Sequence, residues 1–140
     1  MKISDVMTPN PKTVKPTDSL QMAAEIMRDE DTGVVPVVED GRIVGVVTDR
    51  DIVIRAVADG DFTARVHDIV SDDVVTATPD MDTADASELM SEHQIRRLPV
   101  IDEADVLVGI VSLGDLAVKE GRDSRMGETL ENISEGVKRH

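Results

Sequence analysis

Two short stretches of the chain carry a hydroxyl residue three positions before an aspartate, each after an apolar run. Residues 45–51 read Gly-Val-Val-Thr-Asp-Arg-Asp, and residues 109–115 read Gly-Ile-Val-Ser-Leu-Gly-Asp. The apolar part is typical of the end of a buried strand, and the aspartate opens an apolar run with helical spacing. Because one carboxylate can accept two hydrogen bonds from a vicinal diol, Asp51 and Asp115 are candidate ribose ligands. The free N–H groups of a helix start also suit a polar or anionic ligand.

A helix-capping box is the alternative interpretation of the same spacing. Thr48 with Asp51, and Ser112 with Asp115, would then satisfy only the unpaired N–H groups of the first helical turn. Either junction alone favours the cap, whereas the recurrence of the whole pattern favours a duplicated ligand site.

Composition narrows the class of ligand. The 140 residues carry a net charge of −14, which repels phosphate backbones and argues against DNA or RNA as a partner. A small phosphorylated ligand would therefore need a local cluster of Lys or Arg. Phe62 is the only aromatic residue, so a bound base would pack on aliphatic side chains and proline.

The chain lacks the patterns that mark catalytic or metal sites. There is no cysteine, P-loop, Gly-x-Gly-x-x-Gly pattern or His-x-x-x-His pair. We therefore expect no enzymatic activity, no metal and no required cofactor. No apolar run reaches membrane-spanning length and the first residues form no apolar signal region, so we expect a cytoplasmic protein with no membrane partner.

The two junctions belong to an internal repeat that spans most of the chain. With a shift of 63, residues 3–7 align with 66–70 and residues 35–38 align with 98–101. One further residue in the second turn raises the shift to 64 for the closing strands and helices. We expect a first repeat at residues 1–65, a second repeat at 66–122 and a C-terminal tail at 123–140.

Hydrophobic spacing predicts the order β-α-β-β-α in each repeat. The first helix is expected to begin after a cap at Thr17 or Asp18 and to bury Ala24, and Gly41 is expected to adopt a positive φ. The other expected elements are strands at residues 13–14, 34–38 and 43–47 and a closing helix at 49–58, with counterparts at 75–77, 98–101, 106–111 and 115–119. About 60 residues bury too little surface to be stable alone. We therefore expect an α+β fold in which the two repeats pack sheet to sheet with pseudo-two-fold symmetry.

The repeated pattern resembles a known family. Both copies contain an apolar-Pro-apolar strand followed by Gly, two apolar residues, Thr or Ser, two variable residues and Asp. In this respect residues 1–120 resemble a pair of CBS domains (cystathionine-β-synthase type), also called a Bateman module. Residues 48–55 and 93–100 resemble small stand-alone bacterial proteins of this type.

The resemblance implies adenine-nucleotide binding in clefts between the sheets. Asp51 and Asp115 would hold ribose hydroxyls, and Thr48 and Ser112 would contact ribose or phosphate. Backbone near Thr13-Val14 and near Thr76-Ala77 would read the adenine edge, and the base would be walled by Val34 to Pro36 and by Leu98 to Pro99.

The resemblance also implies that the two sites are unequal. Arg96 and Arg97 match positions that meet phosphates, whereas the first repeat has Gly33 and Val34 there. Phosphate at the first site would need Arg55, Lys12, Lys15 or arginines of the second repeat. We expect the site around Ser112 and Asp115 to be the more competent one. Alternatively, the two arginines are strand residues paired to Glu92 or Asp102.

The implied function is that of a regulatory module. Its ligand would be AMP, ADP, ATP or a related adenosyl compound, and binding would change the packing of the repeats. An unidentified effector protein would read that change. The resemblance also implies a homodimer. The alternative is a structural or stress-related dimer with vestigial, empty clefts.

Overall fold

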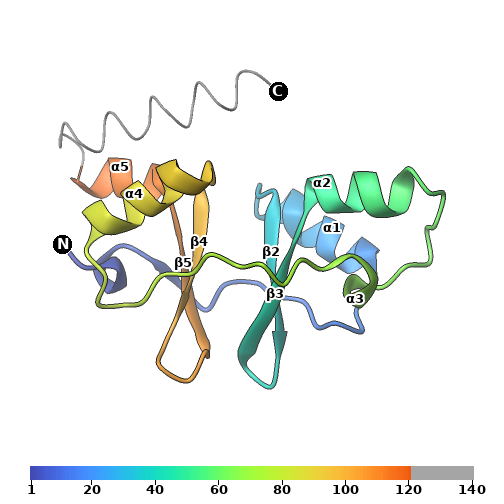
Figure 1. The fold of residues 1–140 in the computed structure, drawn as a ribbon, viewed down its shortest axis with the longest axis horizontal. Helices are drawn as coiled ribbons and strands as arrows, with labels where there is room; N and C mark the ends of the chain where they lie inside the picture. The colour runs from blue at the N-terminus through green and yellow to red at the C-terminus, as the bar shows by residue number, and fades with distance from the viewer. Residues whose placement is uncertain (121–140) are drawn as a thin grey trace. The chain divides into compact units, whose positions relative to one another are not determined.

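The computed structural model describes residues 1–120, which form two compact units (Figure 1). Unit 1 combines Met1–Pro11 and Val75–Glu103 with the chain from Val108, and unit 2 combines Lys12–Val74 with Ala104–Leu107. Each unit mixes helices with a small sheet, so the expected α+β class is confirmed. The expected tail at 123–140 lies outside the described residues.

Unit 2 is built on the β2–β3 hairpin. Its elements are α1 (Leu20–Asp29), β2 (Val34–Glu39), β3 (Arg42–Thr48), α2 (Asp49–Ile52), the π-helical turn η2 (Val53–Val57) and α3 (Val66–Ile69). The strands are antiparallel, with Val34 opposite Thr48. Gly41 lies in the turn between them with φ +80, as expected for a left-handed position.

Unit 1 repeats this arrangement around the β4–β5 hairpin. Its elements are the 3-10 helix η1 (Ile3–Asp5), β1 (Thr8–Pro9), α4 (Thr83–His93), β4 (Arg97–Ile101), β5 (Leu107–Ser112) and α5 (Leu113–Glu120). The strand order of its sheet is β1-β5-β4. The two hairpins and the helices that flank them therefore follow the predicted order, with ends shifted by one or two residues, whereas η1, β1 and α3 were not predicted.

An extended segment joins the first strand of each hairpin. The Val14 N–H donates to the carbonyl of Pro36 at 3.1 Å, and the Val38 N–H donates to the carbonyl of Val14 at 2.9 Å. Ala77 makes the equivalent two hydrogen bonds with β4, both at 2.9 Å. Each expected opening strand is thus a single parallel bridge that holds the segment in place.

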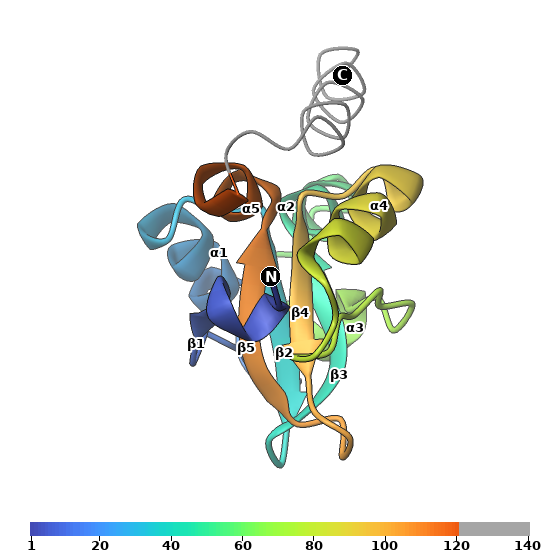
Figure 2. The same ribbon diagram turned by 90° about the vertical axis from the view of Figure 1, so that its left-hand side faces the viewer.

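The second strand of each hairpin pairs with the opening residues of the other repeat. In unit 2, Val46 and Ser71 exchange two backbone hydrogen bonds, at 2.9 and 3.0 Å. In unit 1, β1 pairs with Gly109 and Ile110 of β5, and Figure 2 shows η1 and β1 against that hairpin. The opening segment of the first repeat therefore pairs with the hairpin of the second repeat, and the opening segment of the second repeat pairs with the hairpin of the first.

A glycine allows the close approach at each crossing. A Cβ at position 45 would lie 2.5 Å from Val70 Cγ2 and 2.6 Å from the carbonyl oxygen of Ser71. A Cβ at position 109 would lie 2.5 Å from Met7 Sδ and 3.0 Å from the carbonyl oxygen of Thr8. Because real Cβ contacts are longer than this, only glycine fits without a shift of the crossing segment.

Each unit has its own hydrophobic core. Ile3 and Val6 are buried in the core of unit 1, and their aligned counterparts Val66 and Ile69 are buried in the core of unit 2. The compact units and the sequence repeats therefore do not coincide, since the opening residues of each repeat contribute to the core that surrounds the hairpin of the other repeat.

The first helix differs from expectation at its cap and on one face. The N-cap is Ser19, whose Oγ accepts from the Met22 N–H at 3.2 Å, so α1 begins later than predicted. Asp18 instead accepts from the Lys15 N–H at 2.7 Å and closes the preceding turn. Ala24 is exposed, because the fully packed positions of this helix are Leu20 and Ala23.

Candidate functional site

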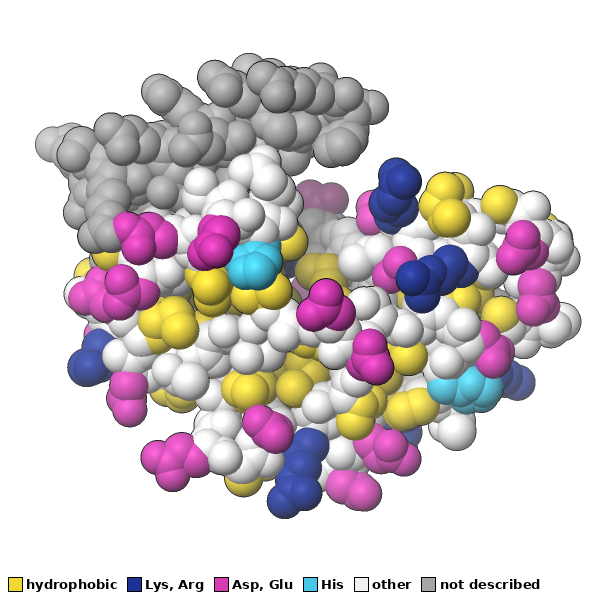
Figure 3. Space-filling view, in the orientation of Figure 1, with side chains coloured by type: hydrophobic (Ala, Val, Ile, Leu, Met, Phe, Trp, Pro, Cys, Tyr) yellow, Lys and Arg dark blue, Asp and Glu magenta, His cyan; other side chains and the backbone are white. Residues whose placement is uncertain are grey.

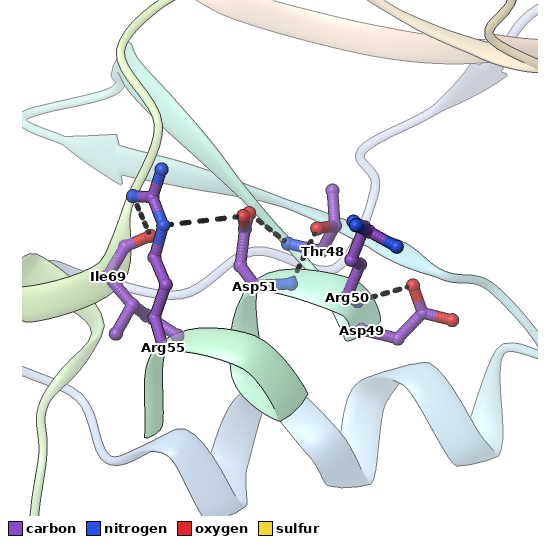
Figure 4. Close-up of polar contacts among 6 residues, drawn as sticks. All are labelled: Thr48, Asp49, Arg50, Asp51, Arg55 and Ile69. Atoms are coloured by element: carbon purple, nitrogen blue, oxygen red, sulfur yellow. Dashed lines mark hydrogen bonds and ion pairs between the residues drawn. The ribbon is translucent and has the colours of Figure 1, made fainter. Parts of the chain in front are cut away.

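Thr48 and Asp51 form a reciprocal cap at the start of α2 (Figure 4). The Asp51 N–H donates to Thr48 Oγ1 at 3.1 Å, and the Thr48 N–H donates to Asp51 Oδ2 at 3.1 Å. The capping interpretation of this spacing is therefore realised. The cap does not use Asp51 Oδ1, and 18% of the Asp51 side chain remains exposed. Because each carboxylate oxygen offers two acceptor sites, the cap leaves acceptors for a diol.

Ser112 and Asp115 repeat this cap at the start of α5. The Asp115 N–H donates to Ser112 Oγ at 3.0 Å, whereas the Ser112 N–H lies 3.4 Å from Asp115 Oδ2. A donor–acceptor distance of 3.4 Å indicates a weak hydrogen bond. The carboxylate of the second repeat is therefore held less firmly by its own helix than that of the first.

Arg55 lies beside the carboxylate of the first cap. Its Nε is 3.9 Å from Asp51 Oδ1, and its Nη1 donates to the carbonyl of Ile69 at 3.4 Å. Both contacts are long, and 53% of the Arg55 side chain is exposed. The guanidinium is thus close enough to compensate the Asp51 charge, although both of its contacts are weak.

The residues before β2 and β4 adjoin the two caps. The Asp49 N–H donates to the carbonyl of Gly33 at 2.9 Å, and the Leu113 N–H donates to the carbonyl of Arg96 at 2.8 Å. These equivalent bonds confirm that Gly33 and Arg96 occupy the same place in the two repeats. The side chain at this place therefore lies next to the capping hydroxyl and carboxylate.

The charge at the position of Gly33 and Arg96 is opposite in the two repeats. Beside Gly33, the Asp49 carboxylate fills the space, since a Cβ at position 33 would lie 3.1 Å from Asp49 Oδ2. In the second repeat, Arg96 is exposed, and Leu113, the counterpart of Asp49, is buried in the core of unit 1. The alignment already places Gly33 opposite Arg96, but the position of the Asp49 carboxylate required the structure.

The opening segment of each repeat offers free backbone groups at a half-buried threonine. Val14 and Ala77 use their N–H and C=O groups to join the sheets and bury their side chains. Within residues 1–120, no hydrogen bond uses the backbone N–H or C=O of the preceding Thr13 or Thr76. These donor and acceptor pairs are the ones that could bind the edge of a base.

The remaining predicted residues differ in exposure. Val34 and Arg97 are half-buried, whereas Pro36, Leu98 and Pro99 are buried. Leu98 belongs to the core of unit 1, so its side chain stabilises the fold. The first expected wall is therefore accessible only at Val34, whereas both residues of the second expected wall are buried.

The structure assembles the predicted residues separately in each unit. Unit 2 holds Thr13, Val14, Val34, Pro36, Thr48, Asp51 and Arg55, and unit 1 holds Thr76, Ala77, Arg96, Arg97, Leu98, Pro99, Ser112 and Asp115. Acidic side chains are spread over the visible face rather than gathered in one cluster (Figure 3). Within residues 1–120, no three His, Asp or Glu side chains are placed to hold a metal ion, and no helix has the length and apolar character to cross a bilayer.

The duplicated geometry agrees with comparisons to known proteins. A sequence profile of the CBS domain matches residues 3–57 and 66–119. The chain belongs to the CBS-domain family. A CBS domain-containing protein of Bacillus subtilis, YhcV, is 45% identical over 133 residues, which cover 94% of each chain.

Solved structures of CBS proteins share the fold. Hypoxic Response Protein I, solved with two coordinated zinc ions, has a TM-score of 0.76 at 35% identity, over 84% of this chain and 98% of that one. CBSX2 in complex with AMP has a TM-score of 0.74 at 28% identity, over 86% and 98%. The CBS domain pair of protein MJ0100, in complex with 5′-methylthioadenosine and S-adenosyl-L-methionine, has a TM-score of 0.75 at 29% identity, over 86% and 96%.

Proposed function

We propose that this CBS pair is a regulatory module that binds adenosyl ligands and has no catalytic function of its own. The observation that carries the proposal is the duplicated set of polar groups. Each repeat places a capping carboxylate with unused acceptors and a threonine with free backbone groups at its hairpin. Two related CBS structures hold AMP or adenosyl compounds, which supports the same class of ligand here.

Each group has a separate role in the proposed complex. Asp51 and Asp115 accept hydrogen bonds from ribose hydroxyls, and the backbone of Thr13 and Thr76 recognises the adenine edge. Recognition through backbone groups and a carboxylate requires no aromatic platform, in agreement with a chain whose only aromatic residue is Phe62.

Binding titrations on matched variants test this proposal. Asp115→Asn keeps an oxygen that can accept from the Ser112 N–H and removes the negative charge, so it preserves the cap better than alanine would. We expect about 10- to 100-fold weaker AMP binding in calorimetry, since hydrogen bonds to a charged group contribute about 1.5–3 kcal/mol. Thermal stability should change little. Native mass spectrometry of gently purified protein reports any retained ligand.

Absence of binding to every adenosyl ligand would refute the proposal. If AMP, ADP, ATP, 5′-methylthioadenosine and S-adenosylmethionine all give no heat with the wild-type protein, the adenosyl function is wrong. The caps would then serve only the helices, as in a structural CBS protein with empty clefts.

We further propose that the ligand acts on a partner protein through a change in the packing of the two repeats. A ligand shifts such an equilibrium only by its different affinity for the two arrangements. Hydrogen exchange with and without AMP tests this step. Protection confined to the ligand-binding residues would contradict it, whereas changes that extend to the cores of both units would support it.

The exposed helix surface of unit 2 supports a homodimer. Met22 on α1 and Val53, Ile54 and Val57 on η2 are 45–54% exposed, and α1 packs beside α2. Hydrophobic side chains also appear over the α2–η2 helix in Figure 3. An apolar surface of this kind is typical of an association site. Ile54→Glu should convert the dimer to a monomer in light scattering, whereas a wild-type protein that is already monomeric would contradict the proposal.

A further inference from the structure

The two repeats carry different charges at the same place beside their caps. In the first repeat, Gly33 has no side chain and the Asp49 carboxylate lies against it, 3.1 Å from where a Cβ would be. In the second repeat, an exposed arginine, Arg96, stands at that place, and the counterpart of Asp49 is the buried Leu113. The backbone hydrogen bonds at 2.9 and 2.8 Å make the two places directly comparable.

The residues around these two positions also differ in net charge between the repeats. Residues 33, 34 and 49–51 of the first repeat contain one arginine and two aspartates, which leaves a net charge of −1. The matching residues 96, 97 and 113–115 contain two arginines and one aspartate, which leaves +1. The two places therefore differ by two charges in a protein that is strongly acidic overall.

Arg55 does not remove this difference. Its Nε lies 3.9 Å from Asp51 Oδ1, so its charge is directed at the carboxylate proposed to hold the ribose. Its other contact is the Ile69 carbonyl, on the side of α3 (Figure 4). In these contacts the guanidinium compensates Asp51 and leaves Asp49 as the charge beside Gly33.

We propose that the two sites sort adenosyl ligands by the charge of the 5′ substituent. The site of the second repeat takes a phosphorylated nucleoside, and the site of the first repeat takes a nucleoside whose 5′ substituent is neutral or cationic. This inference rests on the proposed adenosyl-binding function and adds the ligand class of each site. It would allow one acidic chain to sense two kinds of adenosyl compound at once.

The physical basis is the charge next to the bound sugar. A phosphate on a sugar held by Asp51 would approach the Asp49 carboxylate with no arginine at position 33, whereas a phosphate on a sugar held by Asp115 would approach the exposed Arg96. Guanidinium groups bind phosphate oxygens in strong charge-assisted hydrogen bonds. One unit charge about 4 Å from a phosphate in a partly hydrated site changes the affinity for that phosphate by about tenfold.

The test uses AMP and 5′-methylthioadenosine as the anionic and neutral probes, on the full-length protein. We expect wild type to bind one of each per chain without competition in calorimetry. Asp115→Asn should weaken AMP binding by about 10- to 100-fold and leave 5′-methylthioadenosine binding unchanged, whereas Asp51→Asn should weaken 5′-methylthioadenosine binding by a similar factor and leave AMP binding unchanged. Both variants retain an oxygen for their cap, so circular dichroism serves as the folding control.

Charge variants then test the cause. Asp49→Asn keeps an oxygen for the Arg50 N–H, which now donates to Asp49 Oδ1 at 2.8 Å, but removes the charge. It should admit a second AMP with about tenfold higher affinity at the first site. Arg96→Gln should weaken AMP at the second site by about tenfold and leave 5′-methylthioadenosine unchanged. Both effects should shrink in 0.5 M salt, where the screening length falls to about 4 Å.

Three outcomes decide the matter. The inference is supported if AMP binds at the second site, 5′-methylthioadenosine binds at the first site, and Asp49→Asn raises the affinity of the first site for AMP. Competition of both probes for one site, or an Asp49→Asn protein that binds AMP as wild type does, overturns it and leaves the adenosyl-binding function standing. Absence of binding by either probe overturns the proposed function itself, and the sorting with it.

Discussion

Replacing Gly45 by alanine tests whether the crossing of the two repeats holds unit 2 together. The new Cβ would lie 2.5 Å from Val70 Cγ2 and 2.6 Å from the Ser71 carbonyl oxygen. The valine can change rotamer, but the carbonyl belongs to the backbone and accepts from the Val46 N–H at 2.9 Å. The crossing segment therefore has to move, and the pairing of Val46 with Ser71 weakens or breaks.

The loss of stability caused by Gly45→Ala can be estimated as the sum of three contributions. Overpacking in a buried position costs about 1–3 kcal/mol, and each lost backbone hydrogen bond adds about 1 kcal/mol. Alanine also lowers the conformational entropy of the unfolded chain, which stabilises the folded protein by about 0.5–1 kcal/mol. We expect Gly45→Ala to lower the free energy of unfolding by about 2 kcal/mol, which moves the urea midpoint by about 1 M for a typical slope.

Urea unfolding followed by circular dichroism at 222 nm is the suitable assay, because the chain has no Trp or Tyr for fluorescence. Gly114→Ala is the matched control, since a Cβ there meets only Ser112 Oγ at 3.8 Å and the position is helical. It should be neutral or slightly stabilising. A Gly45→Ala protein within about 0.5 kcal/mol of wild type, the range of ordinary surface substitutions, would refute the close crossing.

Three further predictions concern local packing. Gly109→Ala should cost less than Gly45→Ala, about 1 kcal/mol in urea unfolding, because the atom nearest to the new Cβ, at 2.5 Å, is Sδ of the flexible Met7 side chain and the nearest backbone atom, the Thr8 carbonyl oxygen, is at 3.0 Å. Met7→Ala should then reduce the cost of Gly109→Ala, with the remainder due to the Thr8 carbonyl oxygen, and additive effects would contradict this. Ser19→Ala should cost about 1 kcal/mol by loss of the α1 cap, whereas Thr17→Ala should be neutral in the same assay.

The order of elements could be predicted because the repeat supplied each pattern twice. The helical pattern around Ala86 is weak by itself, but the repeat aligns it with α1, and the structure has α4 at Thr83–His93. The position of Gly41 also followed from local chemistry, since its turn needs a positive φ. Helix ends were less certain, because Thr17, Asp18 and Ser19 are all residues that cap helices well.

The exchange of opening segments could not be predicted from the pattern. Residues 3–7 and 66–70 show the same apolar spacing, so either could pack on either hairpin. Which sheet they join is a choice between two equivalent long-range pairings, and periodicity contains no information about it.

The candidate site was predictable as a set of residue types but not as a set of contacts. The Thr/Ser-x-x-Asp pattern indicated both the cap and the sugar ligand, and the structure confirms the cap. The use of Val14 rather than Thr13 to join the sheet, and the placement of the Asp49 carboxylate over Gly33, depend on tertiary packing. Both details affect which groups remain free for a ligand.

The exchanged opening segments bear on how such a chain could arise by gene duplication. A single copy of about 60 residues would lack the segment that closes its own hydrophobic core, because Ile3 and Val66 each fill the core built around the hairpin of the other repeat. Two separate copies could nevertheless complete one another by trading these segments. Fusion of the genes would then make an existing exchange between molecules permanent, and the two halves would be free to diverge while remaining mutually dependent for folding.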